Sequence, residues 1–141
     1  MSVECFIDTN LFLYQIENVD KRKSHIADQI IRKGIRTKNA CISFQVVQEC
    51  LNVLLRKAVV PLNPMEANRY FDSVLSPLWQ VMPNHDLYHQ GIEIQARYRF
   101  SFYDSLIIAA SLSAGCRILY TEDMKHDQKI GKLTIHNPFR V

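Results

Sequence analysis

The chain has 141 residues, of which 48% are hydrophobic and 22% charged, and this composition excludes disordered and fibrous proteins. The length suits one domain over residues 1–141, long enough to bury a core and too short for two such domains. The net charge of +3 permits an anionic partner without requiring one, and the apolar run at residues 106–114 is far shorter than the ~20 residues that cross a membrane.

The first half of the chain alternates short apolar runs with amphipathic segments. Residues 3–7 are apolar and end at a polar turn, and residues 21–35 place isoleucines on one helical face. Ser43 is a candidate N-cap for a further helix, which should end before Pro61. In chain order we predict a strand at 3–7, helices at 11–16 and 21–35, a strand at 40–42 and a helix from 44 through 54.

The second half contains two clear signals for the start of a helix. Asn63 can act as a cap, Pro64 occupies the first helical position and Glu66 can cap back. A second capping box begins at Ser101, and Gly115 stands where the apolar helix after it should end. In chain order we predict a helix at 64–75, a strand at 79–82, helices at 86–100 and 101–114, and strands at 117–120 and 132–135.

Short strands that alternate with helices predict an α/β fold, a three-layer α/β/α arrangement with a mostly parallel central sheet. In such sheets the binding crevice lies at the carboxyl ends of the strands. Asp8 and Asp123 each follow a predicted strand, so we expect both at this edge.

The cysteines and histidines do not predict a metal site. One helical face could carry His85 and His89 and bind a metal, but no nearby Glu or Cys completes a ligand set, so we favour a solvated helix face. The cysteines lack the spacing of a zinc knuckle or a redox motif. We expect buried, reduced thiols at Cys5, Cys41, Cys50 and Cys116.

Two acidic residues in the first half are candidates for chemistry. Asp8 could be a plain N-cap of the following helix, but Asn10 offers a second oxygen close by, and such a pair can face a hydrated cation. Glu49 shares a helical face with Val46 and Val53. We therefore expect Glu49 to be partly buried and to need a cationic partner, either a metal ion or a distant residue.

Two further candidates lie in the second half. Asp104 stands where a capping-box acid would, but it opens a helix predicted to be buried and should face a crevice. Asp123 is interpreted as the inward acid of its segment, with Glu122 as a solvated turn charge. Asp127 is more typical of the surface than of a site.

Four carboxylates brought together repel, by about 4 kcal/mol for a pair ~4 Å apart at an effective dielectric of ~20. A hard divalent cation, Mg²⁺ or Mn²⁺, would offset this repulsion through oxygen ligands, and the lack of a His or Cys cluster disfavours zinc. Such a site suits phosphodiester hydrolysis. Thr9, Asn10 and Thr121 could orient a water or a phosphate, and basic residues on the surrounding helices could hold the polyanion.

Four segments, in order, resemble the acidic motifs of PIN domains: residues 7–10 (Ile-Asp-Thr-Asn), the helical Glu49, residues 103–107 (Tyr-Asp-Ser-Leu-Ile) and residues 119–123 (Leu-Tyr-Thr-Glu-Asp). The resemblance covers essentially the whole chain and is strongest to the VapC-type toxins of bacterial toxin–antitoxin pairs, one branch of which ends much like residues 135–139. The chain departs from the commonest pattern at Lys125 and His126, where a second Asp and a Phe are usual. This leaves open whether Asp127 adds an outer ligand.

The resemblance implies a metal-dependent endoribonuclease that cleaves RNA, has a cognate antitoxin as partner and forms a homodimer. It implies that the catalytic ligands of Mg²⁺ or Mn²⁺ are Asp8, Glu49, Asp104 and Asp123, with Asn10 and Thr121 as supporting polar residues. The N-terminus lacks the basic start and apolar stretch of a secretory signal, so we expect a cytoplasmic location and no membrane partner.

Two other interpretations are open at this point. A phosphatase with an aspartyl nucleophile also has an Asp after its first strand, but that chemistry needs a second Asp at the position of Asn10. A catalytically idle PIN fold that binds RNA or protein is the more serious alternative. The presence of all four acids argues against it.

Overall fold

A central sheet organises the molecule. The computed structural model describes residues 3–58 and 61–141, and within these residues the sheet has six strands in the order β3-β2-β1-β4-β6-β5. The strands are β1 (Cys5–Ile7), β2 (Ala40–Ser43), β3 (Trp79–Val81), β4 (Ile118–Tyr120), β5 (Lys129–Ile130) and β6 (Leu133–His136). Each is short, so helices contribute most of the packed core.

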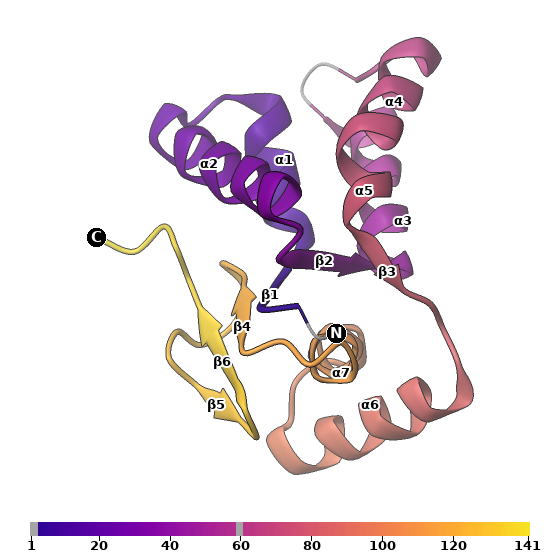
Figure 1. Ribbon diagram of the computed structural model, residues 1–141, viewed down its shortest axis with the longest axis vertical. Helices are drawn as coiled ribbons and strands as arrows, with labels where there is room; N and C mark the ends of the chain where they lie inside the picture. The colour runs from indigo at the N-terminus through magenta and orange to yellow at the C-terminus, as the bar shows by residue number, and fades with distance from the viewer. Residues whose placement is uncertain (1–2, 59–60) are drawn as a thin grey trace.

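Helices cover both faces of the sheet (Figure 1). They are α1 (Thr9–Glu17), α2 (Lys21–Thr37), α3 (Phe44–Asn52), α4 (Pro64–Tyr70), α5 (Ser76–Leu78), α6 (His85–Tyr98) and α7 (Phe102–Ser113), with π-helical turns η1 (Val53–Lys57) and η2 (Phe71–Leu75). The helices between β1 and β3 lie on one face, and α6 and α7 lie on the other (Figure 1). The predicted three-layer α/β/α fold with a mostly parallel sheet is confirmed.

Parallel pairing brings several chain segments to one edge. Strand β1 pairs in parallel with β2 on one side, where Phe6 lies opposite Cys41, and with β4 on the other, where Phe6 lies opposite Leu119. The residues that follow these strands, including Asp8 and Thr121, therefore leave the sheet at its carboxyl edge.

The far edge of the sheet differs from the prediction. Strand β5 pairs antiparallel with β6 through a turn in which Gly131 has φ 59°. The predicted strand at 132–135 is displaced by one residue, because Lys132 belongs to this turn. A strand of two residues has no alternating pattern from which it could be predicted.

The helix starts follow the predicted signals with one difference. At α4 both halves of the capping box form, since the N–H of Glu66 donates to Asn63 Oδ1 at 2.8 Å and the N–H of Asn63 donates to Glu66 Oε1 at 3.0 Å. Ser43 stands at the N-cap of α3, but its hydroxyl makes no capping hydrogen bond. The helix that begins with α3 continues through η1 and ends before Pro61, as predicted.

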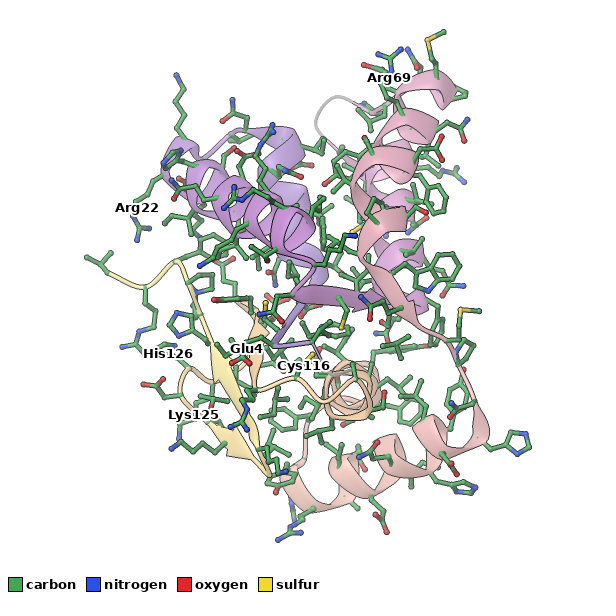
Figure 2. All side chains as sticks on the ribbon, viewed as in Figure 1. Glu4, Arg22, Arg69, Cys116, Lys125 and His126 are labelled. Atoms are coloured by element: carbon green, nitrogen blue, oxygen red, sulfur yellow. The ribbon has the colours of Figure 1, made fainter. Side chains whose placement is uncertain are left out.

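Side chains from the sheet and helices fill the space between the layers (Figure 2). The core includes Phe6, Leu119 and Ile108, all fully buried. Cys116 lies inside this core, whereas Arg69 points outward (Figure 2). All cysteines are free, and Cys41, Cys50 and Cys116 are buried as predicted, whereas Cys5 is only partly buried. No helix in the described residues is long and apolar enough to cross a membrane.

Candidate active site

Asp8 is a buried carboxylate at the junction of β1 and α1. Its side chain is 5% exposed, and it caps α1 by accepting the N–H of Thr9 on Oδ1 at 2.7 Å. The other oxygen, Oδ2, accepts the hydroxyl of Thr121 at 2.9 Å. The N-cap role predicted as an alternative is therefore real, but it uses only one of the two oxygens.

Thr121 connects the ends of the two central strands. Its fully buried hydroxyl donates to Asp8 and accepts the backbone N–H of Asp123 at 3.1 Å. The amide nitrogen of Asn10 lies 3.4 Å from the same hydroxyl and donates to Asp123 Oδ2 at 3.0 Å. Asn10 and Thr121 thus hydrogen-bond to the carboxylates of Asp8 and Asp123 and orient them.

Glu49 differs from the prediction in its burial. It is exposed on α3, so the expected desolvation of its carboxylate does not arise. The Glu49 side chain reaches across to α1 and is not buried against its own helix. There the hydroxyl of Thr9 donates to Glu49 Oε1 at 2.8 Å. Val53 shares this side of the helix as predicted, but the side opens onto a pocket, so the Glu49 side chain stays exposed.

Asp104 lies in the first turn of α7 and is partly buried. The backbone N–H of Asp104 donates to the hydroxyl of Ser101 at 3.1 Å, which is the first half of the predicted capping box. Its carboxylate faces the same pocket as Glu49, as expected for an acid that faces a crevice.

One pocket of about 340 Å³ collects these side chains at the carboxyl edge of the sheet. Its walls come from α1, α3, η1, α7 and the segment after β4, so residues far apart in the sequence meet there. The acids that line it are Asp8, Glu49, Asp104 and Asp123. The structure therefore brings all four predicted residues to one place, whereas Asp127 is exposed and does not line this pocket.

The pocket disfavours the charged forms of two of its carboxylates, Asp8 and Asp104. The pKa of Asp8 is raised to about 7, chiefly by burial and also by the nearby charges of Glu49 and Asp123, while the hydrogen bonds from Thr9 and Thr121 act in the opposite direction. Partial burial and the charge of Asp123 also raise the pKa of Asp104. A bound cation would favour the charged forms of both groups.

The donor set of the pocket fits a hard divalent cation. Its acids offer carboxylate oxygens, and no His or Cys side chain lines it among the described residues. In addition, Asn10 Oδ1 is buried and has no hydrogen-bond partner in the described part of the chain, so this oxygen can still accept a donor or a cation. Mg²⁺ and Mn²⁺ match these ligands better than zinc does.

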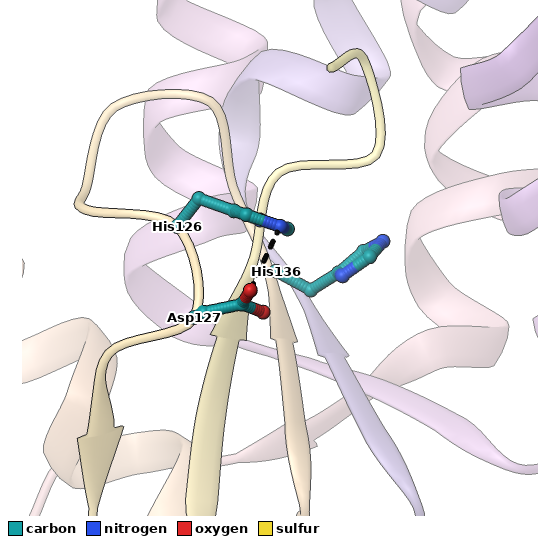
Figure 3. Close-up of side chains that lie close together, drawn as sticks. All are labelled: His126, Asp127 and His136. Carbon is teal, nitrogen blue, oxygen red and sulfur yellow. Dashed lines mark ion pairs between the residues drawn. The ribbon is translucent and has the colours of Figure 1, made fainter. Parts of the chain in front are cut away.

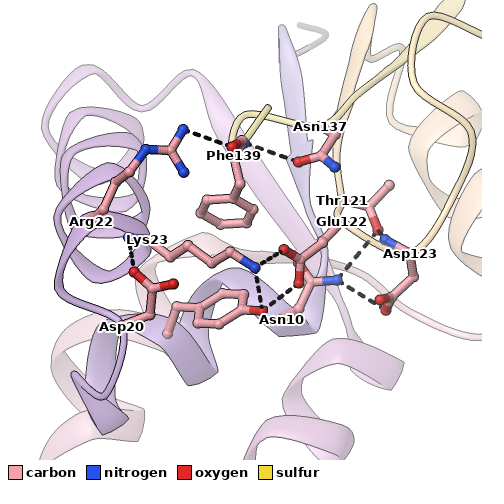
Figure 4. A network of polar contacts seen from close by, with 10 residues as sticks. Asn10, Asp20, Arg22, Lys23, Thr121, Glu122, Asp123, Asn137 and Phe139 are labelled. Atoms are coloured by element: carbon pink, nitrogen blue, oxygen red, sulfur yellow. Dashed lines mark hydrogen bonds and ion pairs between the residues drawn. The ribbon is translucent and has the colours of Figure 1, made fainter. Parts of the chain in front are cut away.

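The loop that carries Asp123 is tied to the helices α1 and α2 through Glu122 (Figure 4). The Glu122 carboxylate accepts the Tyr14 hydroxyl and pairs with the Lys23 ammonium. Partial burial raises the pKa of Glu122, but these two hydrogen bonds outweigh that effect and the net shift is downward. Glu122 is therefore not the solvated turn charge that was predicted.

The C-terminal segment adds to this attachment. Arg22 donates to the backbone oxygen of Phe139 at 2.7 Å, and the Phe139 ring lies 5.0 Å from the ring of Tyr14 (Figure 4). The Lys23 ammonium lies 5.7 Å from the centre of the Phe139 ring. The ion pair of Lys23 and Glu122 is thus covered by an aromatic side chain.

A second cluster, His126, Asp127 and His136, lies beside the ends of β5 and β6 (Figure 3). The backbone N–H of Asn137 donates to His126 Nδ1 at 3.0 Å, so a neutral His126 carries its proton on Nε2, which faces Asp127 Oδ2 at 3.3 Å. A metal ligand needs a free lone pair, which Nε2 then lacks. Hydrogen bonding therefore accounts for this cluster. His85 and His89 are exposed on α6, the solvated face that we favoured.

Sequence reasoning missed several polar residues of the pocket. Gln45, Asn52 and Lys57 also line it. Gln45 lies four residues before Glu49 and Asn52 three after it, spacings that place both on the same side of a helix, whereas Lys57 lies eight after it, a spacing that a regular α-helix turns away from Glu49. The first two follow from this periodicity, but Lys57 depends on the π-helical turn η1, which the sequence did not predict.

Solved structures of similar fold include several toxin–antitoxin proteins. A chain of a toxin–antitoxin complex from Klebsiella pneumoniae is 15% identical with a TM-score of 0.69, and the match covers 98% of this chain and 100% of that one. VapC20 from Mycobacterium tuberculosis, a Sarcin-Ricin loop cleaving toxin, is 21% identical with a TM-score of 0.61, and the match covers 85% of this chain and 90% of that one. A chain of DNA-bound VapBC from Salmonella typhimurium is 19% identical with a TM-score of 0.67, and the match covers 96% of this chain and 98% of that one. At these identities the likeness is one of fold.

The sequence itself gives the family. No curated protein sequence matches the chain. The PIN domain profile matches residues 5–131, a span that contains Asp8, Glu49, Asp104 and Asp123. The chain belongs to the PIN domain family.

Proposed function

We propose that the protein is a metal-dependent endoribonuclease that hydrolyses phosphodiester bonds of RNA. The observation that carries this proposal is the pocket in which carboxylates from four separate chain segments meet at the carboxyl edge of the sheet. Membership of the PIN domain family and the fold shared with VapC20 support it.

Asp8, Glu49, Asp104 and Asp123 are the residues that would hold Mg²⁺ or Mn²⁺. Such an ion lowers the pKa of a bound water and offsets negative charge that develops on the phosphate oxygens. The chain's own hydrogen bonds orient the ligands before any ion binds: Thr121 fixes Asp8, Asn10 fixes Asp123 and Thr9 fixes Glu49. Fixed ligands lose little conformational entropy when the ion and the substrate bind.

We further propose that the described residues form one domain, that the protein is the toxin of a toxin–antitoxin pair, and that it acts in the cytoplasm as a homodimer. The similar structures from Klebsiella pneumoniae and Salmonella typhimurium are of a toxin–antitoxin complex and of VapBC, which supports a cognate antitoxin as partner. The net charge of +3 is compatible with an RNA substrate.

The test of the proposed activity is Asp8→Asn. This change keeps the shape of the side chain and the capping acceptor for Thr9 but removes the charge of a ligand. We expect wild-type protein with Mg²⁺ or Mn²⁺ to cleave RNA, and the variant to show no cleavage above background while its circular dichroism spectrum is unchanged. Glu93→Gln, an exposed acid on α6, is the matched control and should cleave like wild type.

Chelation separates a metal-dependent activity from other nuclease chemistry. Cleavage by the wild-type protein should stop in EDTA and return when Mg²⁺ or Mn²⁺ is added in excess. Cleavage that persists in EDTA would disprove the metal mechanism. RNA binding without cleavage under every metal condition would instead support the idle binding module.

A further inference from the structure

The acidic pocket contains one cationic side chain, which the proposed hydrolysis does not yet use. Lys57 lines the pocket together with Asp8, Glu49, Asp104 and Asp123, and it is the only Lys or Arg among the described residues that line it. Its side chain is exposed, so the ammonium group can move at the mouth of the pocket.

The π-helical turn η1 places Lys57 there. Eight residues separate Lys57 from Glu49, and in a regular α-helix with 3.6 residues per turn this spacing rotates the side chain by about 80° away from Glu49. In η1 the N–H of Ala58 donates to the oxygen of Val53 at 2.8 Å, five residues back, so each turn takes more residues. The wider turn removes part of the rotation and keeps Lys57 on the side of the helix that faces the pocket.

Among the residues that the structure describes, the ammonium of Lys57 has no partner. In the part of the chain that the structure describes, Lys57 takes part in no ion pair and no side-chain hydrogen bond, whereas Lys23 pairs with Glu122 and Arg32 with Asp28. Three of the pocket acids, Glu49, Asp123 and Asp8, are held by hydrogen bonds from Thr9, Asn10 and Thr121 instead. A lysine that lines an acidic pocket without pairing to its carboxylates is available for an anionic ligand.

We propose that Lys57 binds a backbone phosphate of single-stranded RNA at the mouth of the pocket, next to the bond that is cleaved. This inference rests on the proposed ribonuclease function and adds a substrate-binding residue to it. The carboxylates of the pocket repel a polyanion, and a positive charge at the rim offsets this repulsion where the strand enters. Because a backbone phosphate is the same at every nucleotide, this contact contributes affinity without sequence preference.

The contact between Lys57 and the phosphate is present in the bound substrate as well as in the transition state. It therefore stabilises both equally and affects KM and not kcat. Lys57→Met should therefore raise KM for RNA cleavage by about fivefold at low salt and leave kcat within about twofold. Lys57→Arg, which keeps the charge, should restore most of the loss. A fall in kcat with an unchanged KM would overturn the assignment.

Direct binding separates this role from the chemistry. The same substitutions are made in the Asp8→Asn protein, and binding to a fluorescein-labelled single-stranded oligoribonucleotide is followed by fluorescence anisotropy across a range of KCl concentrations. Lys57→Met should weaken binding about fivefold and reduce the slope of log K against log salt by ~0.7. Arg56→Met is the matched control, because Arg56 is the preceding residue, carries the same charge, is exposed and does not line the pocket. It should change the slope much less.

Two outcomes would overturn the inference. Lys57→Met and Arg56→Met could have equal effects, in which case Lys57 adds only to the general surface charge. Alternatively, Lys57→Met could leave RNA binding unchanged and tighten Mg²⁺ binding, in which case Lys57 serves to neutralise the acids. If the wild-type protein binds RNA but never cleaves it, the proposed hydrolysis fails, and the anisotropy comparison still decides the role of Lys57.

Discussion

A carboxylate with a pKa near neutrality makes Asp8 sensitive to pH. In the folded protein its pKa is raised from 3.8 to about 7, first by burial and then by Glu49 and Asp123. The folded state therefore holds this proton more tightly than the unfolded chain does. The stability that Asp8 contributes is greatest below its pKa in the unfolded chain, 3.8. It is lost as the pH rises through its pKa in the folded protein, about 7.

We predict that metal-free wild-type protein becomes less stable relative to Asp8→Asn as the pH rises from 5.5 to 8, by about 2 kcal/mol. Burial lowers the pKa of His136, so this group makes both proteins more stable as the pH rises. The quantity to compare is therefore the difference in unfolding free energy between wild type and Asp8→Asn, in which the contribution of His136 cancels. Urea denaturation in EDTA at several pH values measures it. A difference that stays constant across this range would show that Asp8 is not a neutral acid in the folded protein.

The individual site residues were predictable to different degrees. Asp8 and Asp123 follow strands, and the carboxyl edge of a parallel sheet is a general place for chemistry, so position alone indicated them. Glu49 was placed in the site by resemblance, while the physical reason given for it, partial burial, was wrong. Lys57 was not foreseen, because its orientation depends on a local change in helical pitch that has no established sequence pattern.

At the scale of elements, the packing of α2 on β2 depends on Gly34. A Cβ at this position would lie 2.6 Å from the Cβ of Ala40, closer than side-chain atoms can pack. A Cβ at Gly91 of α6 would lie 2.8 Å from Cδ2 of Leu106, the flexible end of a side chain that can move aside. The two glycines are both helical and buried, so they form a matched pair.

We predict that Gly34→Ala destabilises the protein by about 1–3 kcal/mol through overpacking, although alanine favours a helix by about 1 kcal/mol. Gly91→Ala should change stability by less than about 1 kcal/mol, since helix propensity offsets the displacement of Leu106. Urea midpoints at constant m-value give both numbers. A Gly34→Ala protein as stable as wild type would mean that α2 can shift away from β2 at no cost.

The order of the larger elements could be read from the sequence, and the smallest could not. Periodicity located the long helix α2, and capping signals located the starts of α4 and α7, where Asn63 and Ser101 stand. Strand β5 has two residues and depends on pairing with β6, so its existence is decided by tertiary contacts. The turn glycine, Gly131, was the one local signal for this hairpin.

For the whole molecule, the proposed metal site links ion binding to stability. An ion that binds only the folded state raises its stability by about 2.7 kcal/mol at a concentration one hundred times its Kd. We predict that saturating Mg²⁺ or Mn²⁺ raises the Tm by about 10 °C at pH 8, and by less at pH 6, where protons compete for Asp8.

Differential scanning fluorimetry with and without EDTA measures this shift. Glu93→Gln should respond like wild type, whereas Asp8→Asn should lose most of the shift. A Tm that does not respond to either ion would contradict a metal site formed by these four acids. Light scattering on the same samples tests the proposed homodimer, which should have twice the 16.4 kDa mass of one chain.

The two outer strands of the sheet also restrict how molecules can associate. Strand β3 at one edge has three residues and β5 at the other has two. A strand from a neighbouring molecule would find few unpaired backbone groups at either edge, so growth of the sheet from one molecule to the next gains little energy. Association of this protein with other molecules is therefore expected to depend on surface side chains and not on pairing of its edge strands.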